Sequence, residues 1–316
     1  MKLQVVLTRI LLPASAMLLL VSACDLVGNQ RTYASPQEAV DALMAAVKSG
    51  NTNQLLRVLG KEAKPLVDSG DPVQDRNTGQ RFVDLYTQSH KLATRDDGAQ
   101  ILEVGSDEWP FPFPLVQESG KWRFDDGEGV EEIVDRRVGR NELSAIQACL
   151  AYVDAQREYY ARDPDDDPLL HYAQLLISTP GKRDGLYWEA GVAEVPSPLG
   201  PAYANARAAG YGKQESGKPQ PFYGYYYRIL KGQGSNAKGG AYDYIVHDRM
   251  IGGFGLIAYP ADYGNSGVMT FVVNHDGVVF SKDLGKDTEK LAGEMNVFDP
   301  DETWKREGDA NAAPAG

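Results

Sequence analysis

The stretch GRNELSAIQACLAYVDAQREYY, residues 139–160, decides how we expect this chain to fold. Four apolar residues recur in it at steps of three and four, which is the spacing of one face of an α-helix. They are Leu143, Ile146, Leu150 and Val153. A stripe of this width is typical of a helix face that packs on a core. We therefore predict one amphipathic helix with this stripe buried.

The start of the helix is predicted at Asn141, because an asparagine oxygen can accept from the unpaired N–H groups of a first turn. Glu142 would then place negative charge near the positive end of the helix dipole. The preceding basic residues DRRVGR, 135–140, are interpreted as a short connector. The flanks of the stripe are formed by Ala145, Cys149, Tyr152 and Gln156.

Beyond the helix, the sequence pattern changes to that of β-strands. Strands are predicted at 222–230, 241–246, 254–260, 268–273 and 278–280, and short helices at 169–177 and within 197–209. Asp276-Gly277 between two apolar runs indicates a hairpin, because both residues tolerate positive φ. Strands so close in sequence should pair antiparallel. The second half is thus predicted as an antiparallel sheet packed across the helix.

The first half contains helices followed by strands. Ser35-Pro36-Gln37-Glu38 is typical of a helix start, with Ser at the N-cap and Pro in the first turn. Further helices are predicted at 52–59 and 80–90, and strands at 101–104 and 121–124. The α+β order is similar to the cone-shaped folds of the nuclear-transport-factor-two-like (NTF2-like) superfamily, a resemblance of fold alone.

The segment WPFPFPL, 109–115, has a period of two, with aromatic residues on one face and prolines on the other. Because proline lacks the N–H donor, we expect an edge strand or a polyproline II segment. Its aromatic face would lie on the core of the first domain; the alternative is an exposed strip that contacts a partner.

The start of the chain resembles the signal peptide of a bacterial lipoprotein. Lys2 and Arg9 precede the apolar run 10–21, which is too short to span a bilayer. The run ends in Val-Ser-Ala-Cys, and this lipobox implies cleavage before Cys24 and attachment of lipid, such as palmitate, to it. The chain would then lie at the cell envelope facing the periplasm, with Asp25 favouring the inner membrane.

Composition narrows the function classes. The formal net charge is −12, and removal of residues 1–23 would make it more negative by two. Such a chain has no basic surface for nucleic acid, and anionic lipid headgroups would repel it. We therefore expect no nucleic-acid partner, and contact with the membrane through the lipid alone. Once Cys24 carries lipid, Cys149 has no disulfide partner and is interpreted as a buried thiol.

Two loops could bind ligands. The acidic loop DPDDD carries Asp163, Asp165 and Asp167, whose alternating carboxylates could bind calcium, or could simply be solvated. The turn GKRDG carries Lys182, Arg183 and Asp184, which could bind a small anion, or could hold the turn by ion pairs. We predict no catalytic residue, since the sequence contains no hydrolase, zinc-protease, dinucleotide or phosphate-loop motif. No other cofactor is expected.

Several segments resemble an uncharacterised bacterial family, the domain of unknown function 2950. They are WPFPFPLV (109–116), GKWRFD (120–125), GRNEL (139–143), AYVDAQREY (151–159), STPGKRDGLYW (178–188), SPLGP (197–201), GGAYDY (239–244), MIGGF (250–254) and VNHDGVV (273–279). The resemblance implies no activity.

The second half is also similar to the globular heads of type IV pilins and type II secretion pseudopilins. The similarity lies in the order of four features: the helix, the tyrosine-rich strand, AYPADYGNSGVMTF and NHDGVV. The long apolar stalk of those proteins is missing here.

We therefore expect a signal peptide (1–23), a lipidated tether (24–34), an N-terminal α+β domain (35–138), a pilin-like α+β domain (139–300) and a disordered tail (301–316). The expected function is a non-enzymatic envelope lipoprotein that binds another envelope component. The alternative is a ligand-binding protein or a hydrolase-type enzyme that uses a cleft between the two domains.

Overall fold

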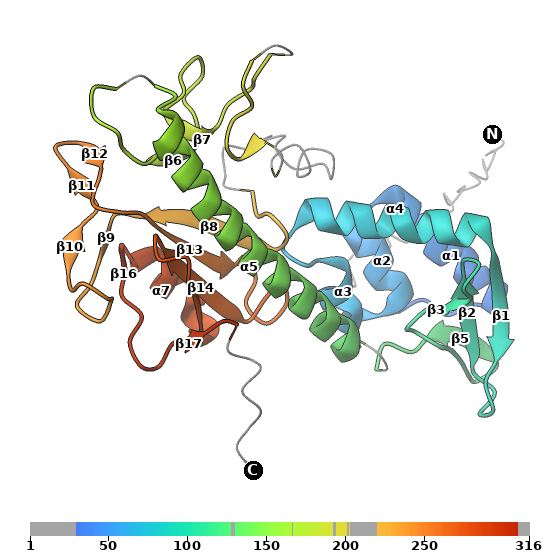
Figure 1. The fold of residues 1–316 in the computed structure, drawn as a ribbon. Coiled ribbons are helices and arrows are strands. Elements are labelled where there is room, and N and C mark those ends of the chain that lie inside the picture. The colour runs from blue at the N-terminus through green and yellow to red at the C-terminus, as the bar shows by residue number, and fades with distance from the viewer. Residues whose placement is uncertain are drawn as a thin grey trace, which may run out of the picture.

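The computed structural model describes residues 30–127, 130–165, 167–191, 194–200, 202 and 220–308. A helix-and-sheet unit forms the blue and cyan end of the molecule, and a larger sheet forms the orange and red end (Figure 1). Helix α5 (Val130–Arg162) runs from one unit to the other. Helices combined with antiparallel sheets confirm the predicted α+β class.

The first domain begins with a group of helices that pack on a small sheet. They are α1 (Pro36–Ser49), α2 (Thr52–Leu59), η1 (Lys61–Ala63), α3 (Lys64–Val67) and α4 (Pro72–Gln88). The predicted helix start is confirmed, because the Ser35 hydroxyl oxygen accepts from the Glu38 N–H at 3.2 Å. The third predicted helix is α4, which begins eight residues earlier than expected, at a cap formed by Asp71.

The strands of this domain form one antiparallel sheet in the order β1-β2-β4-β5, with β3 beside β2. They are β1 (His90–Thr94), β2 (Gln100–Val104), β3 (Trp109–Pro110), β4 (Leu115–Glu118) and β5 (Lys121–Phe124). Phe111, Phe113 and Leu115 are buried in the core, whereas Trp109 is 43% exposed. The aromatic face of this segment therefore packs inward along most of its length.

The start predicted for the long helix was wrong. Helix α5 begins at Val130, so the expected connector 135–140 and the expected domain boundary at 138/139 lie inside it. Asn141 is a buried residue of the helix interior and not its N-cap. The Glu142 carboxylate accepts from the backbone N–H groups of Val268 and Met269, each at 3.0 Å, and so holds the start of a strand of the second domain.

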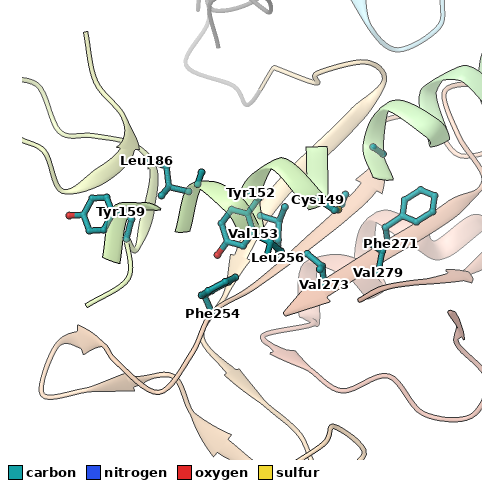
Figure 2. Close-up of a cluster of buried hydrophobic side chains, with 14 of the residues drawn as sticks. Cys149, Tyr152, Val153, Tyr159, Leu186, Phe254, Leu256, Phe271, Val273 and Val279 are labelled. Carbon is teal, nitrogen blue, oxygen red and sulfur yellow. The ribbon is translucent and has the colours of Figure 1, made fainter. Parts of the chain in front are cut away.

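The buried face of α5 is also rotated from the predicted one. Leu143 is 66% exposed and Leu150 is 36% exposed, although Val153 is buried as expected. The core positions recur at steps of four and three, and they are Ala145, Cys149, Tyr152, Gln156 and Tyr159. In Figure 2, the Cys149 and Tyr152 side chains lie over the strands that carry Leu256 and Val273, and Phe254 belongs to the same cluster.

Hydrogen bonds explain why this more polar face is buried. The Tyr152 hydroxyl donates to the Gly255 carbonyl at 3.1 Å. The Gln156 side chain donates to the Ala173 carbonyl at 2.8 Å and accepts from the Ala173 N–H at 2.9 Å. A buried polar group costs little once it is hydrogen-bonded, so partners distant in sequence allow this face to be the inner one.

The second domain is built on an antiparallel sheet in the order β17-β15-β14-β13-β8. The strands of the domain are β6 (Leu175–Ile177), β7 (Gly185–Tyr187), β8 (Tyr225–Leu230), β9 (Gly232–Gln233), β10 (Tyr242–Asp243), β11 (Ile245–Val246), β12 (Arg249–Met250), β13 (Gly255–Pro260), β14 (Met269–Asn274), β15 (Val279–Asp283), β16 (Val297–Phe298) and β17 (Lys305–Arg306). Helix α5 covers one face of the sheet, and α7 (Thr288–Glu294), after the short turn η2 (Gly285–Asp287), packs on the other. The predicted Asp276-Gly277 turn joins β14 to β15, with Gly277 at φ +77°.

Two further expectations for this domain were wrong. The segment 169–177 is not a helix: the Tyr172 N–H donates to the Met250 carbonyl, and Leu175–Ile177 pairs with β7. Backbone amides that bind distant carbonyls cannot also form helical bonds. The tail was predicted to start too early, because Lys305 and Arg306 add a strand to the edge of β15. The helix expected within 197–209 lies largely outside the described residues.

The two domains are joined by a buried polar contact, here called the seam, which is formed by α5, α3, α4 and two loops of the second domain. Arg137 of α5 donates to the Pro65 carbonyl in the first domain and to the backbone and side-chain oxygens of Asn265 in the second. Burial lowers the pKa of Arg137 and raises that of the nearby Asp75 carboxyl. The seam therefore places one cation between two parts of the chain that are distant in sequence.

A second row of bonds runs beside Arg137. The Gln74 side chain donates to the Asn141 side-chain oxygen at 2.8 Å, and Asn141 donates to the Ser266 carbonyl at 2.9 Å. The Asp71 carboxylate that caps α4 also accepts from the Gly224 N–H at 2.9 Å. Gly224 has φ +74°, and a Cβ there would lie 2.5 Å from the Asn141 amide nitrogen, so only glycine fits.

The seam predicts different effects for two arginines on the same helix. Arg137→Ala should lower the free energy of unfolding by about 3 kcal/mol, because it leaves buried carbonyls unpaired and removes the cation near Asp75. The exposed Arg140, one turn later, is the matched control, and Arg140→Ala should change stability by less than about 0.5 kcal/mol. Guanidinium denaturation of both variants measures their free energies of unfolding. If Arg137→Ala lowered this free energy no more than Arg140→Ala does, the seam would not stabilise the fold.

Candidate functional site

A hollow lies beside β7, at the end of α5 that is far from the first domain (Figure 1). Strand β7 pairs in parallel with β6. A Cβ on Gly185 would lie 2.7 Å from the Ser178 backbone nitrogen, so glycine allows the two segments to approach this closely. Leu186 then packs fully into the core, which places the next two residues, Tyr187 and Trp188, at the wall of the hollow.

The hollow, here called the Trp188 hollow, has a volume of about 300 Å³. It is lined by Tyr187, Trp188, Glu189, Ala190, Gly191, Glu194, Pro196, Ser197 and Gly200. This volume lies at the lower limit of small-molecule sites, which are on the order of 300–1,000 Å³. The lining combines the aromatic rings of Tyr187 and Trp188 with two carboxylates and the Ser197 hydroxyl.

Two side chains in this wall carry buried polar atoms without a hydrogen-bond partner. The Trp188 indole nitrogen is one, in a residue that is 9% exposed, and the Ser197 hydroxyl is the other, in a residue that is 3% exposed. An unpaired buried donor or acceptor costs roughly 1–3 kcal/mol. Native proteins retain few such atoms, so two beside one hollow mark it as a candidate site, and each of them is covered by the wall, with less than 1 Å² exposed.

The wall is held by hydrogen bonds to the rest of the domain. The Tyr159 hydroxyl of α5 donates to the Arg183 carbonyl at 2.9 Å, and the Leu199 N–H donates to the Leu186 carbonyl at 3.0 Å. Arg162, at the end of α5, donates to the Pro196 carbonyl at 2.8 Å. Both sides of the hollow are therefore fixed to the same helix and strand.

Among the residues that the structure describes, charge at the rim comes from Arg183, Glu189 and Glu194. A guanidinium nitrogen of Arg183 lies 3.5 Å from a carboxylate oxygen of Glu194. The Arg183 guanidinium carbon also lies 5.7 Å from the centroid of the Trp188 ring, within the range of a cation–π contact.

The three residues of the predicted anion site do not converge. The Asp184 carboxylate accepts from the Thr179 N–H at 2.8 Å and from the Thr179 hydroxyl at 2.9 Å, which closes the turn. Lys182 is exposed, and its backbone N–H donates to the Thr179 carbonyl. Arg183 alone reaches the hollow. The turn is thus held mainly by hydrogen bonds to Thr179, and an anion on Lys182 and Arg183 stays a prediction.

The acidic loop after α5 makes contacts with basic side chains. Asp167 accepts from Arg249 through both oxygens, at 2.9 and 3.0 Å, and this bonding lowers the pKa of the Asp167 carboxyl. Asp165 lies 3.1 Å from the His171 ring nitrogen, and Asp163 follows the helix with φ +47°. Among the described residues, no group of three His, Cys, Asp or Glu side chains could hold a metal ion. Residue 166 lies outside them, so the calcium site stays a prediction.

The two cysteines differ in what the structure describes. Cys24 lies outside the described residues, so its lipidation is untested. Cys149 is fully buried against the sheet, and burial raises the pKa of its thiol to about 12. A thiol in this state is protonated near neutral pH and unreactive, which agrees with its interpretation as a core residue.

A larger hollow, of about 450 Å³, lies near the start of α7. It is lined by Pro260, Ala261, Asp262, Tyr263, Gly264, Lys286, Thr288 and Glu289. None of the buried, unpartnered side-chain atoms among the described residues belongs to this lining. We therefore regard the smaller Trp188 hollow as the better candidate.

The comparisons with known proteins agree with the resemblance seen in the sequence. The family model described as protein of unknown function (DUF2950) matches residues 30–307. The chain belongs to this family. Neither the curated proteins nor the solved structures gave a match. The DUF2950 description names no activity, so the site is assigned from its geometry alone. None of the described helices is long and apolar enough to cross a bilayer.

The sequence indicated a segment beside the hollow, but it did not indicate Trp188 and Ser197 as site residues. The segment STPGKRDGLYW was singled out for its charged turn, whereas Trp188 at its end and Ser197 farther on carry the unpaired atoms. An aromatic pair after a charged turn was the available signal. The burial of Ser197 could not be seen in the sequence, because it depends on how the loop 194–200 packs on β7.

The unpaired hydroxyl gives a test that needs no ligand. Ser197→Ala should leave the free energy of unfolding unchanged or raise it by about 1 kcal/mol, because it removes a buried hydroxyl that bonds to nothing in the free protein. Ser266→Ala is the matched control: its buried hydroxyl donates to the Asp262 carbonyl and accepts from the Asp262 N–H, so stability should fall by roughly 1–2 kcal/mol.

Thermal and guanidinium unfolding of both variants measure the difference. A loss for Ser197→Ala as large as that for Ser266→Ala would mean that the Ser197 hydroxyl is already bonded, and would remove the main argument for the hollow.

Proposed function

We propose that this chain is a lipid-anchored binding protein of the bacterial cell envelope, which holds a ligand in the Trp188 hollow. The observation that carries the proposal is the pair of unpartnered polar atoms, Trp188 Nε1 and Ser197 Oγ, in one aromatic wall. A fold that retains two such atoms loses stability. Both atoms are covered by the wall, with less than 1 Å² exposed, so a ligand that recovers this stability must displace part of the wall to bond to them.

The membrane anchor is supported by the lipobox that ends at Cys24. Gln30 is already tied to the first domain, because its side chain donates to the carbonyls of Val58 and Phe124. Residues 25–29 can span at most about 20 Å when extended. The lipid on Cys24 would therefore hold the first domain close to the membrane surface, and Asp25 favours the inner membrane.

The hollow would then face away from the membrane. Helix α5 has 33 residues and is therefore about 50 Å long. Its start contacts α3 of the first domain, and the hollow lies near its other end (Figure 1). A site at this distance from the anchor is suited to an envelope partner that does not lie in the same membrane.

We also propose that the second domain is organised like the head of a pilin. In support, one long helix crosses an antiparallel sheet, and the Asp276-Gly277 hairpin joins two of its strands. The NTF2-like comparison for the first domain has weaker support, in helices packed on a small sheet. We do not propose the cleft enzyme, because both hollows described above are lined by residues of the second domain alone.

The anchor predicts a specific chemical state of the mature chain. Mass spectrometry of the protein from its native host should find an amino terminus at Cys24 that carries fatty acyl groups. Cys24→Ser should leave the leader uncleaved, because the lipid-modified cysteine is the cleavage signal. Ser22→Ala, in the same segment, keeps the cysteine and should be processed normally. An unmodified terminus at any other residue would contradict the anchor.

Occupancy of the hollow can be measured in isolated envelopes. Ala190→Cys places a thiol at the exposed rim, and Asp96→Cys places one on an exposed turn of the first domain. Cys149 gives little background, because its thiol is buried with a pKa of about 12. A bulky maleimide should label Ala190→Cys several-fold more slowly in envelopes than in the purified lipoprotein, and Asp96→Cys equally in both. Binding at the hollow would be contradicted if the labelling rate in envelopes, relative to that in the purified lipoprotein, were the same for both cysteines.

A further inference from the structure

We infer that strand β1 of the first domain pairs with β1 of a second copy of this chain, so that two copies share one continuous antiparallel sheet. The pairing is independent of the Trp188 hollow and of any ligand bound there. It follows from an open sheet edge in the first domain and from the sequence of that edge.

One edge of the first-domain sheet is closed by the chain itself. The Tyr33 N–H donates to the Trp122 carbonyl and the Trp122 N–H donates to the Tyr33 carbonyl, both at 2.8 Å, so residue 33 covers part of β5. The opposite edge is β1, which pairs with β2 and with no other strand that the structure describes. Figure 1 shows β1 at the end of the molecule that is far from the second domain.

The backbone of β1 turns the polar groups of alternate residues away from β2. The Gly105 N–H donates to the Ser89 carbonyl at 2.9 Å, and the Arg95 N–H donates to the Ala99 carbonyl at 2.8 Å. Because bonded and non-bonded pairs alternate in an antiparallel ladder, the odd-numbered residues of β1 bond to β2. The N–H and C=O groups of the even-numbered residues therefore face the open edge, and among the described residues none bonds to them. These residues are His90, Leu92 and Thr94.

Native proteins usually blunt an open edge with a proline, a bulge or an unpaired charge. Strand β1 contains no proline, and its register with β2 is continuous over all 5 residues. The Lys91 ammonium nitrogen lies 3.2 Å from a Glu103 carboxylate oxygen and 2.7 Å from a Glu108 carboxylate oxygen. Its charge is thus balanced within the same chain, and the edge is suited to accept another strand.

The sequence of β1 is complementary to itself in one register. If the twofold axis passes through Leu92, every outward-facing residue of both copies is bonded, and Lys91 lies opposite the second copy's Ala93. An axis through Lys91 would place two lysines opposite one another, and like charges in that position are destabilising. An axis through Ala93 would leave His90 of each copy without a partner. The register centred on Leu92 is therefore the one we propose.

The proposed lipid anchor would favour this occupant of the edge. Gln30 is tied to the first domain, so neighbouring anchored copies would hold their first domains at a similar height above one membrane. Confinement of this kind raises the effective concentration of the two edges. Figure 1 also places β1 and the end of α5 that carries the hollow at opposite ends of the molecule, so pairing through β1 leaves the hollow free.

Disulfide cross-linking of the full-length protein in membranes of its native host tests the pairing. One copy carries Lys91→Cys and a second copy, with a different tag, carries Ala93→Cys. Opposite residues of an antiparallel pair have Cα atoms about 4.5–5.5 Å apart, which is close enough for a disulfide. Mild oxidation should therefore join the two variants several-fold more than it joins either variant to itself. Cys149 adds little background, because it is fully buried.

A proline at the open edge provides a matched test. Thr94→Pro removes an N–H that faces the open edge and none that bonds to β2, so the domain should stay folded while the mixed cross-link falls several-fold. Thr94→Val keeps this N–H and should leave the cross-link unchanged. Both substitutions remove the hydroxyl that accepts from the Gln100 side chain at 3.0 Å, so they are matched in that loss.

The results separate the alternatives. A mixed cross-link no stronger than the cross-link of either variant with itself would overturn the pairing, as would equal yields with Thr94→Pro and Thr94→Val. A cross-link from Ala93→Cys to a chain of another sequence, identified by peptide mass, would assign the edge to another partner and also overturn it. If Thr94→Pro unfolds at a lower temperature than Thr94→Val, the comparison of mixed with single variants, which contains no proline, decides.

Discussion

Arg137 is the residue on which the arrangement of the two domains depends. Its guanidinium binds the Pro65 carbonyl in one domain and Asn265 in the other, from the middle of a helix that belongs to both. A charge buried in this way is costly unless its donors are all used. The relative position of the domains is therefore set by the few geometries in which Arg137 and its neighbour Asn141 keep their partners.

Local signals in the sequence predicted much of the fold. The Ser35 cap, the Asp276-Gly277 turn and the period-two strands each depend on residues within a few positions of one another. The largest failure was at α5, where the burial of Arg137, Asn141 and Tyr152 depends on partners more than 100 residues away. Arg137 and Asn141 bond to residues 265 and 266, so a polar segment that resembled a connector lies in the core. No local pattern contains that information.

The rotation of the buried face of α5 has the same cause. Leucine spacing predicted the stripe at Leu143 and Leu150, but the sheet packs where Ala145 and Cys149 are small enough for close approach and where Tyr152 finds the Gly255 carbonyl. Hydrophobicity alone ranks leucine above tyrosine or glutamine for burial. A satisfied hydrogen bond removes that difference.

The hollow follows from this packing, and that explains why it could be only partly predicted. Because α5 presents Tyr159 and Arg162 at its far end, it ties down both the Arg183 turn and the loop at Pro196. In the wall between them, Trp188 and Ser197 carry polar atoms without hydrogen-bond partners. A rigid support that leaves polar atoms unpaired costs stability in the free protein. Under the proposed binding function, such a support would lower the ordering cost of binding. Helix α5 would then join the domains through Arg137 and support the site through Tyr159 and Arg162.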